Sequence, residues 1–233
     1  MANTDPGTLD WLAAAGALDE AGWADLGPVL GPDETAALAG LYDEDALFRS
    51  HIRMRRHGFG EGEYKYFAYP LPDSIARLRA GLYPGLADIA NSWMQRLGSE
   101  TRFPPTHAEM LARCDEAGQN RPTPLLLRYG EGDYNCLHQD LYGAVAFPIQ
   151  VVVLLSAPEE FEGGEFVLTV QRPRMQSRAE VVPLRQGHAV AFAVNERPVE
   201  GSRGYYRVKQ RHGVSRIRRG RRQTLGIIFH DAE

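Results

Sequence analysis

The chain has 233 residues, of which 43% are hydrophobic and 24% are charged, an ordinary balance for a globular protein with one sizeable core. No apolar run reaches the roughly 18 residues of a transmembrane helix, and the acidic N-terminus lacks the basic start of a signal peptide. We therefore expect a soluble cytoplasmic protein without a membrane partner. The two cysteines, Cys114 and Cys136, are too few for a disulfide scaffold and fit no zinc pattern, so we expect free thiols.

The net charge of −4 hides an asymmetry along the chain. Residues 1–50 carry ten acids and one base, whereas residues 201–222 carry nine bases and no acid. A basic block of this kind attracts polyanions such as nucleic acid. The alternative is a solvated surface that pairs with the acidic N-terminal half, and charge alone leaves both interpretations open.

The first 120 residues show mainly helical patterns. Apolar residues recur at helical spacing, after start signals, over residues 33–42, 72–93 and 105–114. Pro84 is expected to kink or divide the second of these helices. We therefore predict an N-terminal helical region over residues 1–120.

Residues 51–72 differ from the helices around them. They mix glycine, basic and aromatic residues, with strand-like alternation near Tyr64 and Tyr66. The segment is expected to be either a flexible lid over a substrate or a hairpin packed on the core.

From residue 124 the chain changes to short β-branched and aromatic runs separated by turn residues. The runs are 124–129, 147–156, 164–170, 179–184, 188–194, 204–214 and 222–230. No long helical pattern lies between them, so a jelly-roll sandwich or barrel fits better than a parallel α/β fold. We predict a mainly β protein of the α+β class, whose β core over residues 121–233 forms one integrated domain with the helical region.

A candidate metal site follows the first of these runs. His138 and Asp140 are two residues apart, so on a strand both side chains point to the same side and can reach one metal. His212, at the end of a later run, is the best second histidine. Two histidines and one carboxylate form the facial triad that suits Fe(II) oxygen chemistry. An isolated H-x-D is weak by itself, since a polar turn beside a strand gives the same pattern.

Arg222 opens the last run, ten residues after His212. Its planar guanidinium matches a carboxylate of a dicarboxylic acid in a bidentate ion pair. Thr224 points to the same side of the strand and can add a hydrogen bond. The other histidines are expected to be structural or solvated, with His230 an alternative third ligand if the strand register differs.

The segments RYGEGDYNCLHQD, FEGGEFVL, GHAVAF and HGV followed by GRRQTL occur in this order. In order and spacing, residues 120–231 resemble the 2-oxoglutarate/Fe(II) dioxygenases, whose core is a double-stranded β-helix. The first segment resembles the AlkB type of nucleic-acid demethylase. The longer stretch is similar to a bacterial family described as oxygenases of damaged nucleic acid. The spacing of His212 and Arg222 looks more like the prolyl hydroxylases.

The resemblance implies Fe(II) on His138, Asp140 and His212, 2-oxoglutarate on Arg222, and O₂ as co-substrate. It also implies that Tyr129 hydrogen-bonds the 2-oxoglutarate. Family chemistry converts 2-oxoglutarate to succinate while a substrate C–H bond is oxidised. An N-methyl group oxidised in this way is lost as formaldehyde.

The substrate is left open between classes. A single-stranded or damaged nucleic acid would place an unstacked base in the pocket, with Tyr64, Tyr66 and Phe67 available to stack on it and Gln150 lining the pocket. Phosphates would bind Arg53, Arg55, Arg56 or the arginines of residues 203–221. The alternatives are a hydroxylase of a protein side chain or small molecule, and a non-catalytic cupin-like binding module.

Overall fold

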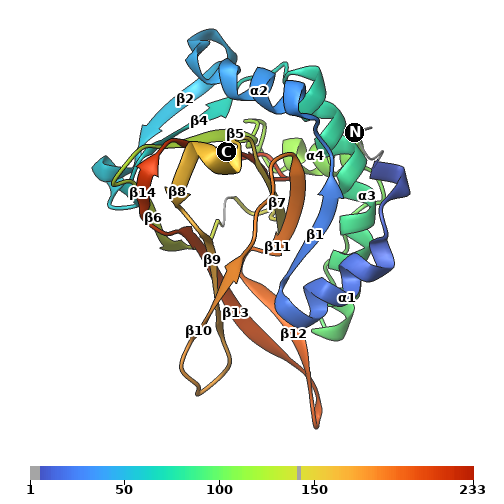
Figure 1. Ribbon diagram of the computed structural model, residues 1–233. Coiled ribbons are helices and arrows are strands. Elements are labelled where there is room, and N and C mark those ends of the chain that lie inside the picture. The colour runs from blue at the N-terminus through green and yellow to red at the C-terminus, as the bar shows by residue number, and fades with distance from the viewer. Residues whose placement is uncertain (1–5, 141–142) are drawn as a thin grey trace.

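In the computed structural model of the protein, residues 6–140 and 143–233 are described. Two β-sheets face each other, and helices cover one side of the barrel (Figure 1). Residues of both sheets line a cavity between them. This is the double-stranded β-helix architecture expected from the sequence, with helices on its N-terminal side. The layers matter for function because the cavity lies between the two sheets.

The larger sheet has seven strands and is antiparallel throughout. Its order is β1 (Trp23–Pro28), β11 (His188–Ala193), β7 (Ile149–Leu154), β15 (Arg222–Ile227), β5 (Leu125–Tyr129), β4 (Glu63–Phe67) and β2 (Phe48–Arg53). Three of these strands, β1, β2 and β4, come from the first 120 residues. The N-terminal region therefore contributes strands to the same sheet as the C-terminal core.

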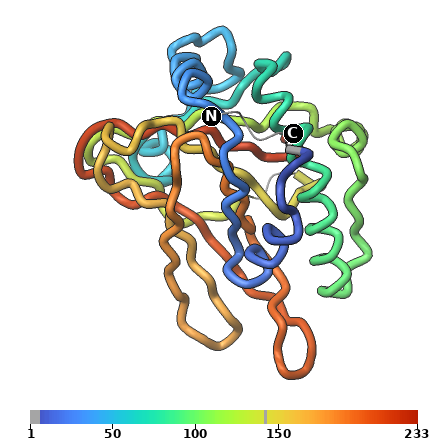
Figure 2. Tube along the Cα trace, turned by 45° about the vertical axis from the view of Figure 1, so that its right-hand side comes forward, coloured from blue at the N-terminus to red at the C-terminus, as the bar shows by residue number. Residues whose placement is uncertain are grey.

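The smaller sheet has the order β10 (Arg178–Val182), β9 (Phe166–Gln171), β13 (Gly204–Val214), β6 (Tyr134–His138) and β3 (Gly60–Glu61). A further strand, β12 (Glu196–Gly201), pairs with β13, and β8 (Phe161–Gly163) pairs with β14 (Ile217–Gly220). The β9–β10 and β12–β13 hairpins project from the body as two separate loops (Figure 2). Residues 209–214 of β13 pair with β9 and stay in the barrel wall, where their side chains can reach the cavity.

In the described part of the chain, four α-helices lie on the outer side of the larger sheet: α1 (Trp11–Ala21), α2 (Pro32–Gly40), α3 (Asp73–Arg96) and α4 (His107–Glu116). The apolar side of α3 packs with the outward-facing residues of β7, β11 and β15 in one large core. Pro84 lies within α3 and does not divide it. The next residue, Gly85, lets α1 approach α3 closely, because a Cβ at this position would lie 2.2 Å from the Trp11 ring.

Alternation along the strands decides which residues reach the cavity. On β7, Val151 and Val153 belong to the core under the helices, whereas Gln150 and Val152 line the cavity. On β15, Arg222 and Thr224 line it. The fold therefore turns one side of each central strand into a wall of the site.

All seven predicted β runs contain observed strands, and the three predicted helices correspond to α2, α3 and α4. Residues 51–72 contain the last three residues of β2 and all of β4, which pair at the edge of the larger sheet. The short strand β3 lies between them and pairs with β6 of the smaller sheet. Helix α1 and strands β1, β8, β12 and β14 were not among the predicted elements, and β6 was expected only as the strand that carries His138. No helix in the described ranges combines the length and apolar character needed to cross a membrane.

Candidate active site

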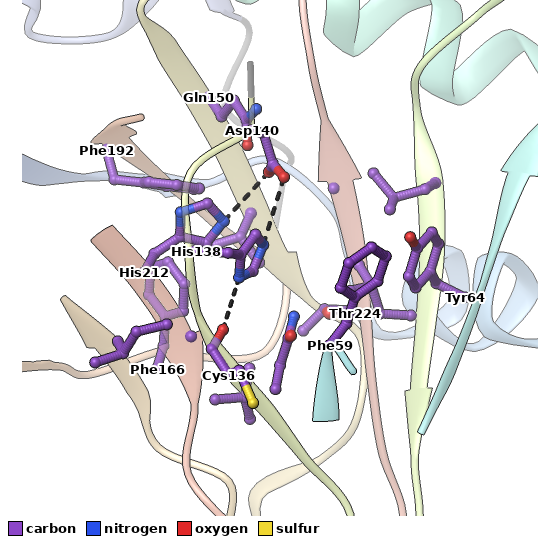
Figure 3. A pocket seen from close by; sticks show the side chains of 18 of the residues that line it. Phe59, Tyr64, Cys136, His138, Asp140, Gln150, Phe166, Phe192, His212 and Thr224 are labelled. Carbon is purple, nitrogen blue, oxygen red and sulfur yellow. Dashed lines mark hydrogen bonds and ion pairs between the residues drawn. The ribbon is translucent and has the colours of Figure 1, made fainter. Parts of the chain in front are cut away.

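His138, Asp140 and His212 lie together at one end of the smaller sheet (Figure 3). His138 is the last residue of β6, and His212 is its direct cross-strand partner on β13. Asp140 follows β6 instead of lying within it, which differs from the simple strand alternation we expected. The donor atoms of the three side chains lie within 4.8 Å of one another.

Asp140 bridges the two imidazoles. Its carboxylate oxygens lie 3.4 Å from Nε2 of His138 and 3.3 Å from Nε2 of His212. Nδ1 of His138 donates to the carbonyl oxygen of Cys136 at 2.8 Å, which directs Nε2 toward Asp140. A backbone acceptor on the second ring nitrogen is the usual way in which a metal-binding histidine is oriented.

Electrostatics favour ligand-competent protonation states at two of these positions. Burial alone would raise the pKa of the Asp140 carboxyl, but hydrogen bonds from His138 and His212 outweigh it and hold the pKa well below its ordinary value. Burial lowers the pKa of His212, so its neutral, metal-binding form is favoured. The rings of Phe192 and Phe166 lie 4.8 and 6.1 Å from the His212 ring and shield it from water.

The three side chains fit a divalent metal. Ligand atoms about 2.1 Å from one metal ion, at right angles, stand roughly 3 Å apart, close to the separations observed here. Two imidazoles and one carboxylate are the donor set of Fe(II) sites with open coordination positions. These three residues are the only such cluster of histidine, cysteine and acidic residues in the described part of the chain.

Arg222 lines the same cavity and is 1% exposed. It forms no ion pair with any described residue, and its Nη1 has no hydrogen-bond partner there. Burial lowers the pKa of Arg222 to about 10, so the guanidinium is still charged at neutral pH. A buried, unpaired cation is costly without an anion, so this position fits the carboxylate of a ligand.

Tyr129 and Thr224 surround Arg222. Tyr129 is the cross-strand partner of Arg222 on β5, and its ring centroid lies 5.8 Å from the guanidinium carbon. Thr224 is two residues further along β15 and lines the cavity (Figure 3). The three side chains therefore form one polar end of an otherwise mostly apolar cavity.

Gly164 is required beside Arg222, and sequence reasoning gave it no role. Its φ of +65° is strained for other residues, and a Cβ there would lie 2.8 Å from Cδ of Arg222 and 2.3 Å from Cδ1 of Ile217. The consecutive glycines Gly163 and Gly164 are the signal that could have revealed this close approach.

Residues 62–232 match the model of a family described as an oxygenase catalysing oxidative methylation of damaged DNA. The chain belongs to this oxygenase family. It is also 50% identical over 192 residues to the uncharacterised protein Rv2227 of Mycobacterium tuberculosis, covering 78% of this chain and 82% of the relative.

Solved structures share the fold of this oxygenase. A prolyl-4-hydroxylase from Pseudomonas putida matches with a TM-score of 0.53 and 16% identity, over 96% of this chain and 99% of that one. A Trichoplax adhaerens prolyl hydroxylase, solved with a peptide of hypoxia inducible factor, matches with a TM-score of 0.56 and 12% identity, over 98% and 96%. A 2OG-Fe(II) oxygenase from Burkholderia pseudomallei matches with a TM-score of 0.54 and 16% identity, over 95% and 91%. Family membership makes the chain an oxygenase, and these solved structures share its fold.

The cavity of the oxygenase has a volume of about 350 Å³. Tyr64 and Tyr66, on β4, line it, with ring centroids 5.5 Å apart in an edge-to-face arrangement. Gln150 and Phe59 line it as well (Figure 3). Phe59, which sequence reasoning missed, is 47% exposed and lies between Gly58 and Gly60, both with positive φ.

Phe67 was wrongly grouped with Tyr64 and Tyr66. It is fully buried in the core under the helices and does not line the cavity. The reason is strand alternation, because Phe67 is one position after Tyr66 and three positions after Tyr64 on β4, so its side chain points to the opposite face. Only the two tyrosines point toward the site.

The remaining histidines lie outside the metal cluster. His230 is buried and its Nδ1 accepts a hydrogen bond from the backbone N–H of Phe147. His188 contacts Asp25 at 3.1 Å, and Nε2 of His107 lies 3.0 Å from the carbonyl oxygen of Phe229. The alternative of His230 as a metal ligand is therefore not supported by the register found.

The basic block does not pair with the acidic N-terminal residues. Within the described ranges, its ion pairs are Arg207 with Glu196, Arg218 with Glu165, and Arg219 with Glu162. Both cysteines are free, as expected.

Proposed function

We propose that the oxygenase removes methyl groups oxidatively from alkylated nucleic-acid bases. Fe(II) is held by His138, Asp140 and His212, and 2-oxoglutarate by Arg222. The observation that carries this assignment is the buried, unpaired guanidinium of Arg222 in the same cavity as the histidine–aspartate cluster.

The residues of the chain position and protect the reactants. Arg222 binds the distal carboxylate of 2-oxoglutarate through its planar fork, Thr224 adds a hydrogen bond, and Tyr129 donates its buried hydroxyl proton to the same end. Phe166 and Phe192 keep water away from the cluster. With iron and 2-oxoglutarate bound, O₂ would be the oxidant: one of its oxygen atoms enters the substrate as a hydroxyl group and the other enters succinate, while 2-oxoglutarate loses CO₂.

A nucleic-acid substrate is supported by the family description and by the surroundings of the cavity mouth. Tyr64, Tyr66 and Phe59 offer flat faces on which an extruded base can stack. The segment that leads to Phe59 carries Arg53, Arg55 and Arg56, and only Arg55 of these forms an ion pair within the described structure, with Glu61. Free arginines beside an aromatic pocket suit a phosphate backbone.

Gly58 and Phe59 line the cavity, and we propose that the Gly58–Gly62 turn covers the bound base. Gly58, Gly60 and Gly62 have positive φ, so the turn depends on glycine at three positions.

A hydroxylase of a protein side chain or small molecule is the second candidate. The observation that favours it is the ten-residue spacing between His212 and Arg222, which looks like that of the prolyl hydroxylases. Both candidates use the same iron and 2-oxoglutarate residues, so they differ only in the substrate.

The test is turnover of anaerobically purified, Fe(II)-reconstituted protein with 2-oxoglutarate and O₂. Succinate and formaldehyde are measured with methylated single-stranded DNA, with its unmethylated counterpart and without DNA. Formaldehyde released only with the methylated strand supports demethylation. Succinate formation that is indifferent to methylated DNA favours the hydroxylase. In either case Asp140→Ala should abolish turnover, and Asp25→Ala, its matched control, should retain it.

A further inference from the structure

Gln150 is an isolated polar residue in the wall of the cavity. It is the only polar residue of β7, whose sequence is IQVVVL, and it is 4% exposed. Its Nε2 has no hydrogen-bond partner among the described residues, although it is buried. A buried amide donor without an acceptor costs stability, so its presence points to a ligand that supplies the acceptor.

Gln150 lies far along the sheet from Arg222, the residue proposed to bind 2-oxoglutarate. On β7 and β15, Val151 pairs with Ile227, so Gln150 lies beyond that pair. Ile227 is five residues from Arg222, which is roughly 17 Å along a strand. Arg222 and Gln150 therefore mark opposite ends of the cavity.

The metal cluster lies next to the Gln150 end. Phe192 is the cross-strand partner of Gln150, and its ring lies 4.8 Å from that of His212. Under the proposed function, one end of 2-oxoglutarate is bound by Arg222 and the other by the metal. Its acceptor is then either the remaining oxygen of the metal-bound carboxylate or an atom of the molecule that is oxidised, and the second is the source taken here.

We propose that Gln150 is a specificity residue whose Nε2 donates a hydrogen bond to a carbonyl oxygen of the substrate base, so that the site selects methylated bases that carry a carbonyl group at C4 of a pyrimidine or C6 of a purine over those that carry an amino group at that position. This inference rests on the proposed function and names the substrate class within it. With the amide turned as found, its Nε2 donor would face an exocyclic amino group, and two donors would be left unpaired in an apolar cavity.

Two pairs of bases isolate this difference. N3-methyluracil and N3-methylcytosine differ only at C4, and N1-methylhypoxanthine and N1-methyladenine differ only at C6, each time by oxygen against nitrogen. Each base is placed in the same single-stranded oligonucleotide. Binding is measured anaerobically by fluorescence polarisation on protein loaded with Fe(II) and 2-oxoglutarate, and formaldehyde release is measured under O₂.

The wild type is expected to bind the carbonyl member of each pair about tenfold or more tightly. Gln150→Leu should remove this preference, and Gln150→Glu should reverse it, because a carboxylate accepts from an amino group. Gln171→Glu, the same change at an exposed position of β9, is the control and should keep the wild-type preference. Since methylated cytosine and adenine carry a positive charge, Gln150→Leu also separates hydrogen bonding from charge.

Several outcomes would overturn the inference. A preference that persists in Gln150→Leu would show that charge or shape selects the base. A loss of 2-oxoglutarate affinity in Gln150→Leu, measured by calorimetry without substrate, would assign the amide to the co-substrate. Equal binding of both members by the wild type removes this inference alone, whereas failure to bind or oxidise any of the four bases removes the proposed function with it.

Discussion

His138 and His212 are direct cross-strand partners on β6 and β13, with ring centroids 4.2 Å apart. The pairing of two strands, and not a local loop, therefore sets the distance between the two imidazoles. The register changes just after His212, at Gly213, where β13 crosses close to β6. The affinity of the proposed iron site should therefore depend also on residues, such as Gly213, whose side chains do not bind the metal.

Gly213→Ala tests this dependence. A Cβ at Gly213 would lie 2.7 Å from the carbonyl oxygen of Asn135, so the strands must separate. We expect Fe(II) affinity to fall by about tenfold or more, as for other changes that disturb the support of metal ligands. Anaerobic metal titration measures it. Gly40→Ala, where no atom lies within 4 Å, should bind iron like the wild type, and unchanged affinity in Gly213→Ala would contradict the dependence on register.

Gly164→Ala should weaken 2-oxoglutarate binding although Gly164 itself is not proposed to contact 2-oxoglutarate. The new methyl group would displace the Arg222 side chain, whose Cδ would lie 2.8 Å away. Gly118→Ala provides the control for backbone strain, because Gly118 also has a positive φ, of +77°, but has open space around its Cβ position. Calorimetric titration with 2-oxoglutarate should show a higher Kd only for Gly164→Ala. Equal effects of both variants would mean that strain, and not Arg222, is responsible.

Arg222→Lys keeps the positive charge and removes the planar fork. Losing one charge-assisted hydrogen bond costs about 1.5–3 kcal/mol, so we expect the Kd of 2-oxoglutarate to rise roughly 10- to 150-fold. Arg178→Lys, at an exposed ion pair with Glu180, should leave this Kd unchanged. A wild-type Kd in Arg222→Lys would show that the fork is not used.

Stability should fall between pH 6.5 and 4, in part because of His230. Burial, followed by the charge of Arg79, lowers the pKa of His230 to about 4, and its Nδ1 accepts from the Phe147 N–H only when unprotonated. The unfolded chain therefore takes up a proton first as pH falls, so this stabilisation is complete above pH 6.5 and is lost toward pH 4. Between pH 7 and 5 the loss is about 2 kcal/mol for one such histidine.

Urea unfolding of wild type and His230→Asn at both pH values measures this contribution. The variant should be less stable at pH 7 but should lose about 2 kcal/mol less on going to pH 5. His57→Asn, at an exposed histidine, should retain the wild-type pH dependence. The same pH dependence in His230→Asn as in the wild type would rule out this histidine as a source.

The sequence was sufficient for much of the candidate site because its signals are local. The spacing of His138 and Asp140 and the arginine at the start of the last strand are short patterns whose residue types carry the chemistry. Short β-branched runs predicted most of the strands of residues 124–230. The pairing of His138 with His212 needed the three-dimensional fold, since 73 residues lie between them in the chain.

Other features had no readable signal. Strand β1, with the sequence WADLGP, contains a register irregularity before Gly27, so it shows no clean alternation. Strand β3 has only two residues, and its pairing with β6 is what brings Phe59 to the cavity mouth. Phe67 was misplaced because aromatic character was weighed above strand alternation. Burial on the sheet, and not residue type, decided its role.

Whether the protein turns over 2-oxoglutarate is decided by succinate formation with the Fe(II)-reconstituted protein under O₂. Wild type, His138→Ala, Arg222→Ala and the control His188→Ala, at a histidine outside the cavity, are compared with and without methylated single-stranded DNA. The proposed iron and 2-oxoglutarate sites predict turnover in wild type and His188→Ala that is stimulated by the methylated strand, with formaldehyde released. Turnover should be abolished in His138→Ala and weakened in Arg222→Ala. Full turnover in His138→Ala, or none in folded, iron-loaded wild type with any methylated strand, would contradict these assignments.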